Sequence, residues 1–205
     1  DLQPIVVDNK EFGINWHGQR GSFGVSRYKT HSDFGASLAV DPISQDFVML
    51  RAPVDIDGYE FNGEFNISEQ WKISGLYSQI RGYTRFAGVT SGPLDREMGI
   101  NDISPDKIGG ALTWNYMPGG SIILGATKLL DRDINQGTSA AESTDGYTLY
   151  DLTANYDAGK YGQFSLGIEN LTNKFYLLSW SQVDFYRNYF AGRGRVVSLS
   201  YSKTF

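Results

Sequence analysis

The sequence contains no cysteine and only two histidines, His17 and His31. Without cysteine there can be no disulfide, no thiolate zinc site and no thiol nucleophile. The two histidines have no partners at metal-ligand spacing and supply little for a serine–histidine catalytic pair. We therefore expect both to be ordinary polar residues, and we assign no catalytic residue and no metal ligand.

Positive charge and long apolar runs are also scarce. The 18 Lys and Arg residues are outnumbered by 23 Asp and Glu residues, giving a net charge of −5. Such a chain has no broad basic surface for nucleic acid. No segment approaches the roughly 20 apolar residues of a membrane-spanning helix, and no signal-peptide pattern opens the chain. A mature or truncated product is the simple interpretation of the start at Asp1.

Apolar and polar residues instead alternate with period two. Near the C-terminus, Val197, Leu199 and Tyr201 share a phase with Phe205, and serines occupy the other phase. The apolar phase continues upstream in seven further sets: 164, 166 and 168; 150, 152, 154 and 156; 108, 112, 114 and 116; 71, 73 and 77; 65 and 67; 59 and 61; and 12, 14 and 16. Charged residues such as Glu60, Glu64 and Lys107 fall in the polar phase. Most of the chain is thus predicted to form strands.

The length of the alternating segments indicates a membrane barrel. Soluble sheets usually have strands of about 5–6 residues, whereas these run for about 10 or more. Nine strands are predicted, at residues 10–17, 20–40, 46–67, 70–83, 105–117, 120–131, 146–157, 161–172 and 193–205. Bacterial single-chain barrels normally have an even strand count, so nine strands indicate part of a larger barrel.

The connections alternate between short and long. Short turns are expected at residues 17–20, 68–70, 118–120 and 157–160, with glycine supplying the positive φ that tight reversals require. Longer connections are expected at residues 81–104, 133–145 and 173–192, with a shorter one at 41–46. Outer-membrane barrels have short periplasmic turns and longer extracellular loops. The long-loop end is therefore predicted to face outward, with aromatic residues near strand ends at the membrane boundary.

Three sequence blocks carry a family resemblance. They are GYTLYDLTANY at residues 146–156, LGIENLTNKFY at 166–176 and GRGRVVSLSYSKTF at 192–205, with weaker support from RAP at 51–53, IDGYE at 56–60 and ISPDK at 103–107. Together and in this order they resemble the barrel of TonB-dependent siderophore receptors. One departure is Leu171-Thr172-Asn173, where the family more often has Phe after the Leu and then Asp.

The resemblance implies an all-β fold, in which residues 1–205 are the C-terminal part of an antiparallel transmembrane barrel of roughly 22 strands. The family's plug domain, and the segment that meets TonB, would lie upstream of Asp1. Leu199, Tyr201 and Phe205 would form the terminal signal for the barrel-insertion machinery. The implied location is the outer membrane of a Gram-negative cell, in contact with its lipid.

The resemblance also implies a function. The intact protein would be a ferric siderophore receptor and TonB-dependent active transporter, and the pattern is closer to receptors for hydroxamate or mixed citrate-hydroxamate siderophores than to those for haem or cobalamin. Iron would be carried as the ferric siderophore, so no cofactor and no enzymatic activity are expected.

Candidate ligand-binding residues lie in two of the long loops. The loop after Asn173 carries Trp180, Phe185, Tyr186, Arg187, Tyr189 and Phe190. An anionic chelate with flat groups suits an arginine surrounded by aromatic rings. Tyr83 and Arg85, with Arg96, form a second, weaker set. The alternative is that these aromatic rings only pack their loop against its neighbours.

Two other function classes share part of this pattern. A passive pore or adhesin barrel would have the same alternation but would lack the three ordered blocks. A barrel enzyme would need acids placed face to face, and Asp131, Asp133 and Glu142 are more simply solvated loop residues. Asp55 and Asp57 before Gly58 lack the remaining positions of a calcium loop.

Overall fold

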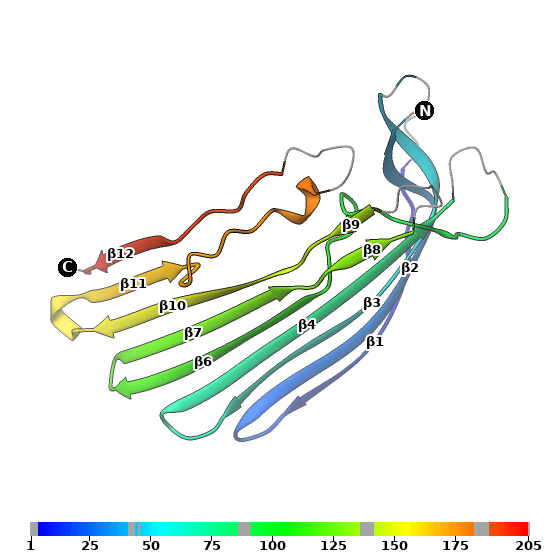
Figure 1. Ribbon diagram of the computed structural model, residues 1–205. Helices are drawn as coiled ribbons and strands as arrows, with labels where there is room; N and C mark the ends of the chain where they lie inside the picture. The colour runs from blue at the N-terminus through cyan, green and yellow to red at the C-terminus, as the bar shows by residue number, and fades with distance from the viewer. Residues whose placement is uncertain are drawn as a thin grey trace.

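The computed structural model describes residues 4–40, 44, 46–85, 91–135, 142–182 and 189–204. Nine long strands form one antiparallel sheet in which neighbours in sequence are neighbours in space (Figure 1). They are β1 (Asp8–His17), β2 (Gly21–Val40), β3 (Phe47–Asn66), β4 (Trp71–Thr84), β6 (Lys107–Met117), β7 (Gly120–Leu129), β10 (Tyr147–Asp157), β11 (Gln163–Glu169) and β12 (Val196–Ser202). The nine predicted strands are confirmed.

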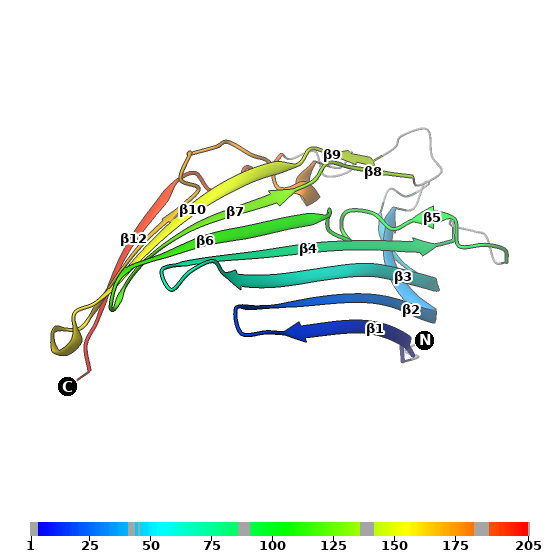
Figure 2. The same ribbon diagram turned by 90° about the horizontal axis from the view of Figure 1, so that it is seen from below.

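The sheet is curved and remains open. Figure 2 shows it bending between β1 and β12, which form its two edges. The backbone hydrogen-bonding groups along the outer sides of these two strands have no partner strand within the described part of the chain. The only helical segments described are two short 3-10 turns, η1 (Gly159–Tyr161) and η2 (Ser179–Ser181). Neither is long or apolar enough for a membrane span.

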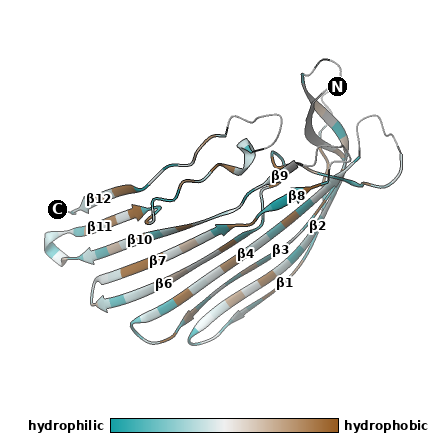
Figure 3. Cartoon of the chain, in the orientation of Figure 1, coloured by the Kyte–Doolittle hydropathy of each residue, from teal (hydrophilic) through white to brown (hydrophobic). Residues whose placement is uncertain are grey.

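The register places apolar and polar residues on opposite faces of the sheet. One cross-strand row joins Leu112, Leu124, Leu152, Ile168 and Val197 on what we call the apolar face. The next row, on the polar face, contains threonine, glycine and serine from four of these strands, and Ile123 from β7. The resulting alternation of hydropathy is visible along the strands in Figure 3.

Large side chains on the apolar face remain uncovered within this chain. Phe12 is 72% exposed and Leu199 is 77% exposed, although both lie in regular strands. An apolar surface of this extent is unstable in water and indicates contact with another apolar phase or partner.

Aromatic rings gather on the apolar face toward the short-turn end of the sheet. Trp71 and Trp114 stack across β4 and β6 with ring centroids 5.5 Å apart and planes inclined by 6°. Trp16 stacks on Phe23 at 5.5 Å across β1 and β2. Phe164 meets Tyr201 at 4.9 Å across β11 and β12. These cross-strand pairs fix the register at the point where the turns begin.

Glycine has two different roles in the short turns. Gly119 and Gly159 have φ values of 77° and 60°, as the turn prediction requires. The same prediction is wrong for Gly18, whose φ is not positive. There, a Cβ atom would lie 2.3 Å from the Trp16 ring, so glycine makes room for an aromatic side chain.

Two of the long connections contain more structure than predicted. In the connection after β4, β5 (Arg96–Glu97) pairs with the end of β4. In the next, β8 (Arg132–Ile134) pairs with β9 (Glu142–Thr144). β11 is shorter than predicted because η1 occupies its expected start. β12 is also shorter, and begins at Val196.

A small core forms where the connection after β5 folds onto the polar face. Met98 and Ile103 pack on Val54 of β3, with Ile56 and Ile80 beside them. The guanidinium of Arg132, itself buried, donates hydrogen bonds to the backbone oxygens of Ile103 at 2.6 Å and Met98 at 3.2 Å. This core holds the connection against the long-loop end of the sheet.

Asn170 fixes the start of the loop between β11 and β12. Its φ is 49° and it is 3% exposed. Its backbone N–H donates to the carboxylate of Asp151 at 2.8 Å, and its side-chain oxygen accepts from the backbone N–H of Lys174 at 2.8 Å. Its side-chain Nδ2 donates to the backbone oxygens of Lys174 and Arg193. The side chain of Asn170 thus joins the two ends of this loop, and its backbone N–H connects them to β10.

Substituting Asn170 should loosen this loop. In Asn170→Ala the three side-chain hydrogen bonds are lost, the backbone groups of Lys174 and Arg193 lose this partner, and a left-handed φ becomes less favourable, so we expect destabilisation of about 1–3 kcal/mol. Hydrogen exchange at the Lys174 amide measures the effect directly, with Thr172→Ala as an exposed control in the same turn. Asn170→Asp keeps the acceptor and should retain protection of that amide. Equal protection in the alanine variant would contradict the assignment.

Candidate functional site

A cavity of about 770 Å³ opens on the polar face at the long-loop end. Its floor is a single cross-strand row from four strands: Ser78, Lys107, Leu129 and Tyr147. Because residues directly opposite one another in antiparallel strands share a face, these four side chains converge. Two loops form the remaining walls, one contributing Ile100, Asn101, Ser104 and Pro105 and the other Leu178, Ser179 and Trp180.

The first loop is anchored immediately before Lys107. The carboxylate of Asp106 accepts hydrogen bonds from the guanidinium of Arg81 and, at 2.9 Å, from the amide of Gln79. The backbone oxygen of Asp106 accepts from the N–H of Leu130 at 2.9 Å. The start of β6 is therefore held on both sides, and Lys107 is positioned at the cavity floor.

The second loop is closed by contacts across its own base. Leu178 N–H donates to the backbone oxygen of Phe190 at 2.9 Å, and Leu177 forms an isolated bridge with Ala191. The buried Ser181 hydroxyl donates to the Leu178 oxygen at 2.7 Å. The Trp180 ring lies 5.2 Å from the ring of Phe190 and remains 44% exposed. Trp180 is thus fixed in place while one part of its surface stays open to a ligand.

The cavity lining combines apolar side chains with hydroxyl, amide and ammonium groups. Lys107 is its one charged residue, and it forms no salt bridge within the part of the chain that the structure describes. The side-chain oxygen of Ser179 is buried and has no hydrogen-bond partner among the described residues. Such a surface suits an amphipathic organic ligand better than a bare ion.

A smaller cavity of about 200 Å³ adjoins the first at Tyr147, which lines both. The rings of Tyr147 and Tyr176 have centroids 4.4 Å apart. Lys174 and Gln182 contribute polar groups to the smaller cavity. Gln182 also accepts a hydrogen bond from the backbone N–H of Asp145 at 2.9 Å, which joins this loop to the start of β10.

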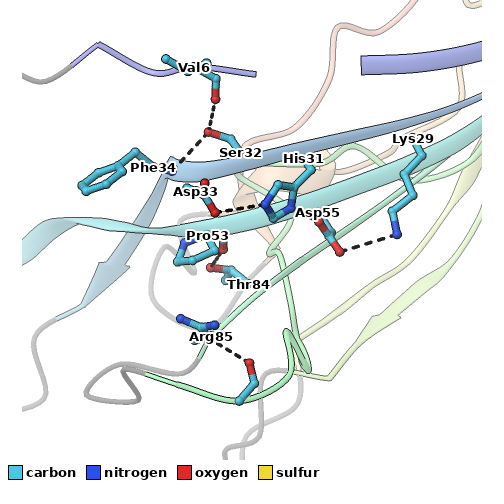
Figure 4. Close-up of polar contacts among 11 residues, drawn as sticks. Val6, Lys29, His31, Ser32, Asp33, Phe34, Pro53, Asp55, Thr84 and Arg85 are labelled. Atoms are coloured by element: carbon cyan, nitrogen blue, oxygen red, sulfur yellow. Dashed lines mark hydrogen bonds and ion pairs between the residues drawn. The ribbon is translucent and has the colours of Figure 1, made fainter. Parts of the chain in front are cut away.

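A charged cluster surrounds His31, which lies in the half of β2 nearer the long-loop end (Figure 4). The two imidazole nitrogens lie 2.5 Å from an Asp55 oxygen and 3.2 Å from an Asp33 oxygen. Asp55 also pairs with Lys29 at 3.7 Å. Hydrogen bonds first to Asp55 and then to Asp33 raise the pKa of His31 above its usual value of 6.5, because both carboxylates favour the imidazolium. The register of β2 and β3 shifts between Ser32 and Gly35, so the cluster lies at an irregularity of the sheet.

Comparison with known proteins identifies the family of this open sheet. Residues 1–171 match the family model described as TonB dependent receptor-like, beta-barrel. The chain belongs to the TonB-dependent receptor family. This confirms the resemblance seen in the sequence, and the family is one of outer-membrane receptors.

One relative by sequence is hemoglobin-haptoglobin utilization protein B of Neisseria meningitidis serogroup A, 24% identical over 86% of this chain. Similar solved structures include the copper transporter OprC, with a TM-score of 0.78 and 16% identity over 97% of this chain. The FrpB iron transporter of Neisseria meningitidis has a TM-score of 0.72 and 18% identity over 94%. The pyoverdine receptor FpvA of Pseudomonas aeruginosa has a TM-score of 0.67 and 17% identity over 97%.

This receptor segment spans only part of each of these proteins. It covers 26% of the length of the Neisseria relative, and 31%, 29% and 29% of the three structures. At these identities the structural matches show the fold alone. The activity, ligand and partners of the whole protein are therefore proposed rather than shown.

The structure brings only some of the predicted ligand-binding residues to the cavity. Trp180 lines it, and Phe190 supports Trp180 from behind. Tyr189 is half exposed, with a left-handed φ of 43°, and does not line the cavity. Phe185, Tyr186 and Arg187 lie outside the described residues. A role in ligand binding stays a prediction for each of them.

The second predicted set lies elsewhere. Tyr83 pairs with Asp55 and Glu97 near the end of β4, and neither Tyr83 nor Arg85 lines the cavity. The side chain of Arg85 donates to the backbone oxygen of Gly92 at 3.2 Å (Figure 4). Arg96 belongs to β5 and pairs with Thr84. The structure therefore does not bring this set together with Trp180.

The predicted insertion signal is partly described. Leu199 and Tyr201 lie on the apolar face of β12, and the Tyr201 hydroxyl donates to the backbone oxygen of Tyr161 at 2.9 Å. Phe205 lies outside the described residues. Recognition of this strand by insertion machinery stays a prediction.

The sequence did not single out Lys107, Tyr147 or Ser179 as site residues. The first two occupy the polar face, but many residues do so, and only the cross-strand register groups them. The run Met98–Pro105, with three large apolar residues inside a connection, could have indicated a loop that packs onto the sheet. Ser179 carries no comparable signal.

The cluster at His31 predicts a measurable titration. Because the folded-state pKa is raised, the stabilisation from these pairs is complete below the unfolded value of 6.5 and is lost as the pH rises through the folded value. We expect an NMR titration of the His31 ring, assigned through His31→Gln, to have its midpoint above 6.5. Asp55→Asn should lower this midpoint more than Asp57→Asn, which alters the neighbouring row of β3. A midpoint at or below 6.5 would rule out the proposed pairing.

Proposed function

We propose that this chain forms barrel wall and outer loops of a receptor that binds a ferric siderophore in the outer membrane of a Gram-negative cell. In the intact protein, a plug domain would close the barrel and TonB would deliver the energy for import. The main support for this proposal is the cavity at the long-loop end. A barrel wall that binds no ligand does not require a cavity beneath two anchored loops.

The two faces of the sheet support the membrane location. The apolar face would contact lipid, and its aromatic pairs near the turns would lie at the boundary between hydrocarbon and headgroups. The polar face would line the lumen and contact the plug. The open edges at β1 and β12 would pair with the remaining barrel strands, since lipid cannot satisfy free backbone groups.

The size and chemistry of the cavity support an organic cargo. Its volume of about 770 Å³ lies within the range of small-molecule sites, roughly 300–1,000 Å³. Trp180 and Tyr147 offer aromatic faces, and Lys107 offers a positive charge. Iron would enter already held by the siderophore, so the receptor needs no cofactor of its own. We propose a hydroxamate or citrate-hydroxamate chelate as the ligand class.

The relatives named above suggest alternative ligands for this receptor. Among solved structures, the similar proteins include receptors bound to ferripyoverdine and a ferric-catecholate import receptor. A structure of FpvAI with pyocin S2 shows that a relative can also bind a protein. The sequence relative named for haemoglobin-haptoglobin use favours a haem-protein receptor as the second candidate. A passive pore or adhesin accounts less well for the cavity.

Binding by the intact receptor in detergent tests the proposal. Ferric hydroxamate, citrate-hydroxamate and catecholate chelates, and haemoglobin, should be titrated while tryptophan fluorescence is followed. We expect saturable quenching by a hydroxamate-type chelate, and about tenfold weaker binding in Trp180→Ala, since an aromatic contact contributes about 0.5–1.5 kcal/mol beyond its buried area. Calorimetry should measure that variant, because it lacks one fluorophore.

Arg187→Gln and Tyr189→Ala test whether the other predicted residues of the loop between β11 and β12 bind the ligand. Trp71→Phe, in the aromatic row, is a matched control that should bind the ligand normally. Binding of haemoglobin alone would favour the second candidate. No binding by any of these ligands, together with general solute leakage through receptor-containing liposomes, would replace the receptor proposal with a passive pore.

A further inference from the structure

Two polar groups at the cavity lack partners among the residues that the structure describes. Lys107 lies on the floor, and none of the described lining residues is a carboxylate. The neighbouring acid Asp106 is engaged by Arg81 and Gln79 rather than by Lys107. The cavity therefore has an uncompensated positive charge.

Ser179 supplies the second unpaired group. The residue is only 9% exposed, lines the cavity, and has a side-chain oxygen with no hydrogen-bond partner in the described chain. The hydroxyl of Ser181, two residues later in the same turn, does have a partner, because it donates to the backbone oxygen of Leu178 at 2.7 Å. A buried hydroxyl without a partner is unfavourable, and a rotation about one bond can present it to a ligand in the cavity.

The rest of the lining is neutral. Its apolar part consists of Ile80, Ile100, Pro105, Leu129, Leu178 and Trp180, and its polar part of Ser78, Asn101, Ser104 and Tyr147. A ligand that matches this arrangement carries one anionic group on an apolar skeleton. A multiply charged ion would leave most of its charge unpaired against apolar walls.

We infer that this cavity binds a carboxylate-bearing arm of the ferric chelate, with Lys107 pairing to the carboxylate and the Ser179 hydroxyl donating a hydrogen bond to it. The iron centre stays outside the cavity, still coordinated by the chelator. This inference rests on the proposed siderophore function and adds a selection rule: chelates with a free carboxylate bind better than neutral chelates of similar size.

A matched pair of ligands tests the rule in the intact receptor. A ferric citrate-hydroxamate with a free carboxylate and a neutral ferric trihydroxamate should be titrated in detergent by calorimetry. Lys107→Met should weaken the carboxylate chelate about ten- to hundredfold, the usual value of a charge-assisted hydrogen bond, and leave the neutral chelate almost unchanged. Lys128→Met is the control. Lys128 lies in the adjacent cross-strand row of β6 and β7, and its side chain is on the opposite face of the sheet.

Ser179→Ala provides an independent readout. It removes an unpaired buried hydroxyl, so the melting temperature should stay the same or rise, whereas affinity for the carboxylate chelate should fall several-fold. A purely structural serine would give the reverse, with lower stability and unchanged affinity.

The outcomes separate the two proposals. If neither chelate binds, the proposed hydroxamate or citrate-hydroxamate ligand class is wrong. If both bind with equal affinity, or if Lys107→Met weakens both equally, the receptor function stands and the carboxylate subsite is wrong. Increasing salt should weaken only the carboxylate chelate, because screening acts on the ion pair.

Discussion

The whole fold depends on one continuous ladder of backbone hydrogen bonds between β1 and β12. Each strand pairs with the next in antiparallel register, so a residue on one face of β1 fixes which residues share that face in every later strand. A slip of one residue anywhere would move leucine and tryptophan to the polar face. The stacked pair of Trp71 and Trp114 and the row that ends at Val197 oppose such a slip.

The same ladder assembles the cavity. Lys107 and Tyr147 are 40 positions apart in the sequence, yet both pair with Leu129 of β7 and so share one row. The loops complete the site only because each is anchored to the sheet. Arg132 and Asp106 hold the first, and Asn170 and Ser181 hold the second. Loop anchoring and strand register therefore act together, and both are needed for Trp180 and Lys107 to line the same cavity.

The motif blocks that carried the family resemblance have a physical explanation. Asp151 of the first block accepts the backbone N–H of Asn170 in the second, and Asn170 in turn binds the backbone oxygen of Arg193 in the third. Asn173 of the second block accepts from the backbone N–H of Arg195 in the third. The three blocks thus meet at one junction where β10, β11 and the approach to β12 converge, which accounts for their order along the chain.

Strand number and strand faces could be predicted from the sequence, because alternation with period two and tight turns are local properties of the chain. Gly119 and Gly159 were predictable for this reason, whereas Gly18 was not, since its role depends on the Trp16 ring beside it. The family was indicated separately, by the resemblance of three sequence blocks. The pairing of β8 with β9, the folding of Met98 and Ile103 onto β3, and the presence of Lys107 and Ser179 in the lining of one cavity arise from contacts between distant segments. Only the tertiary structure decided these features, because many polar residues share one face and the three-dimensional path of two loops selects which of them form a site.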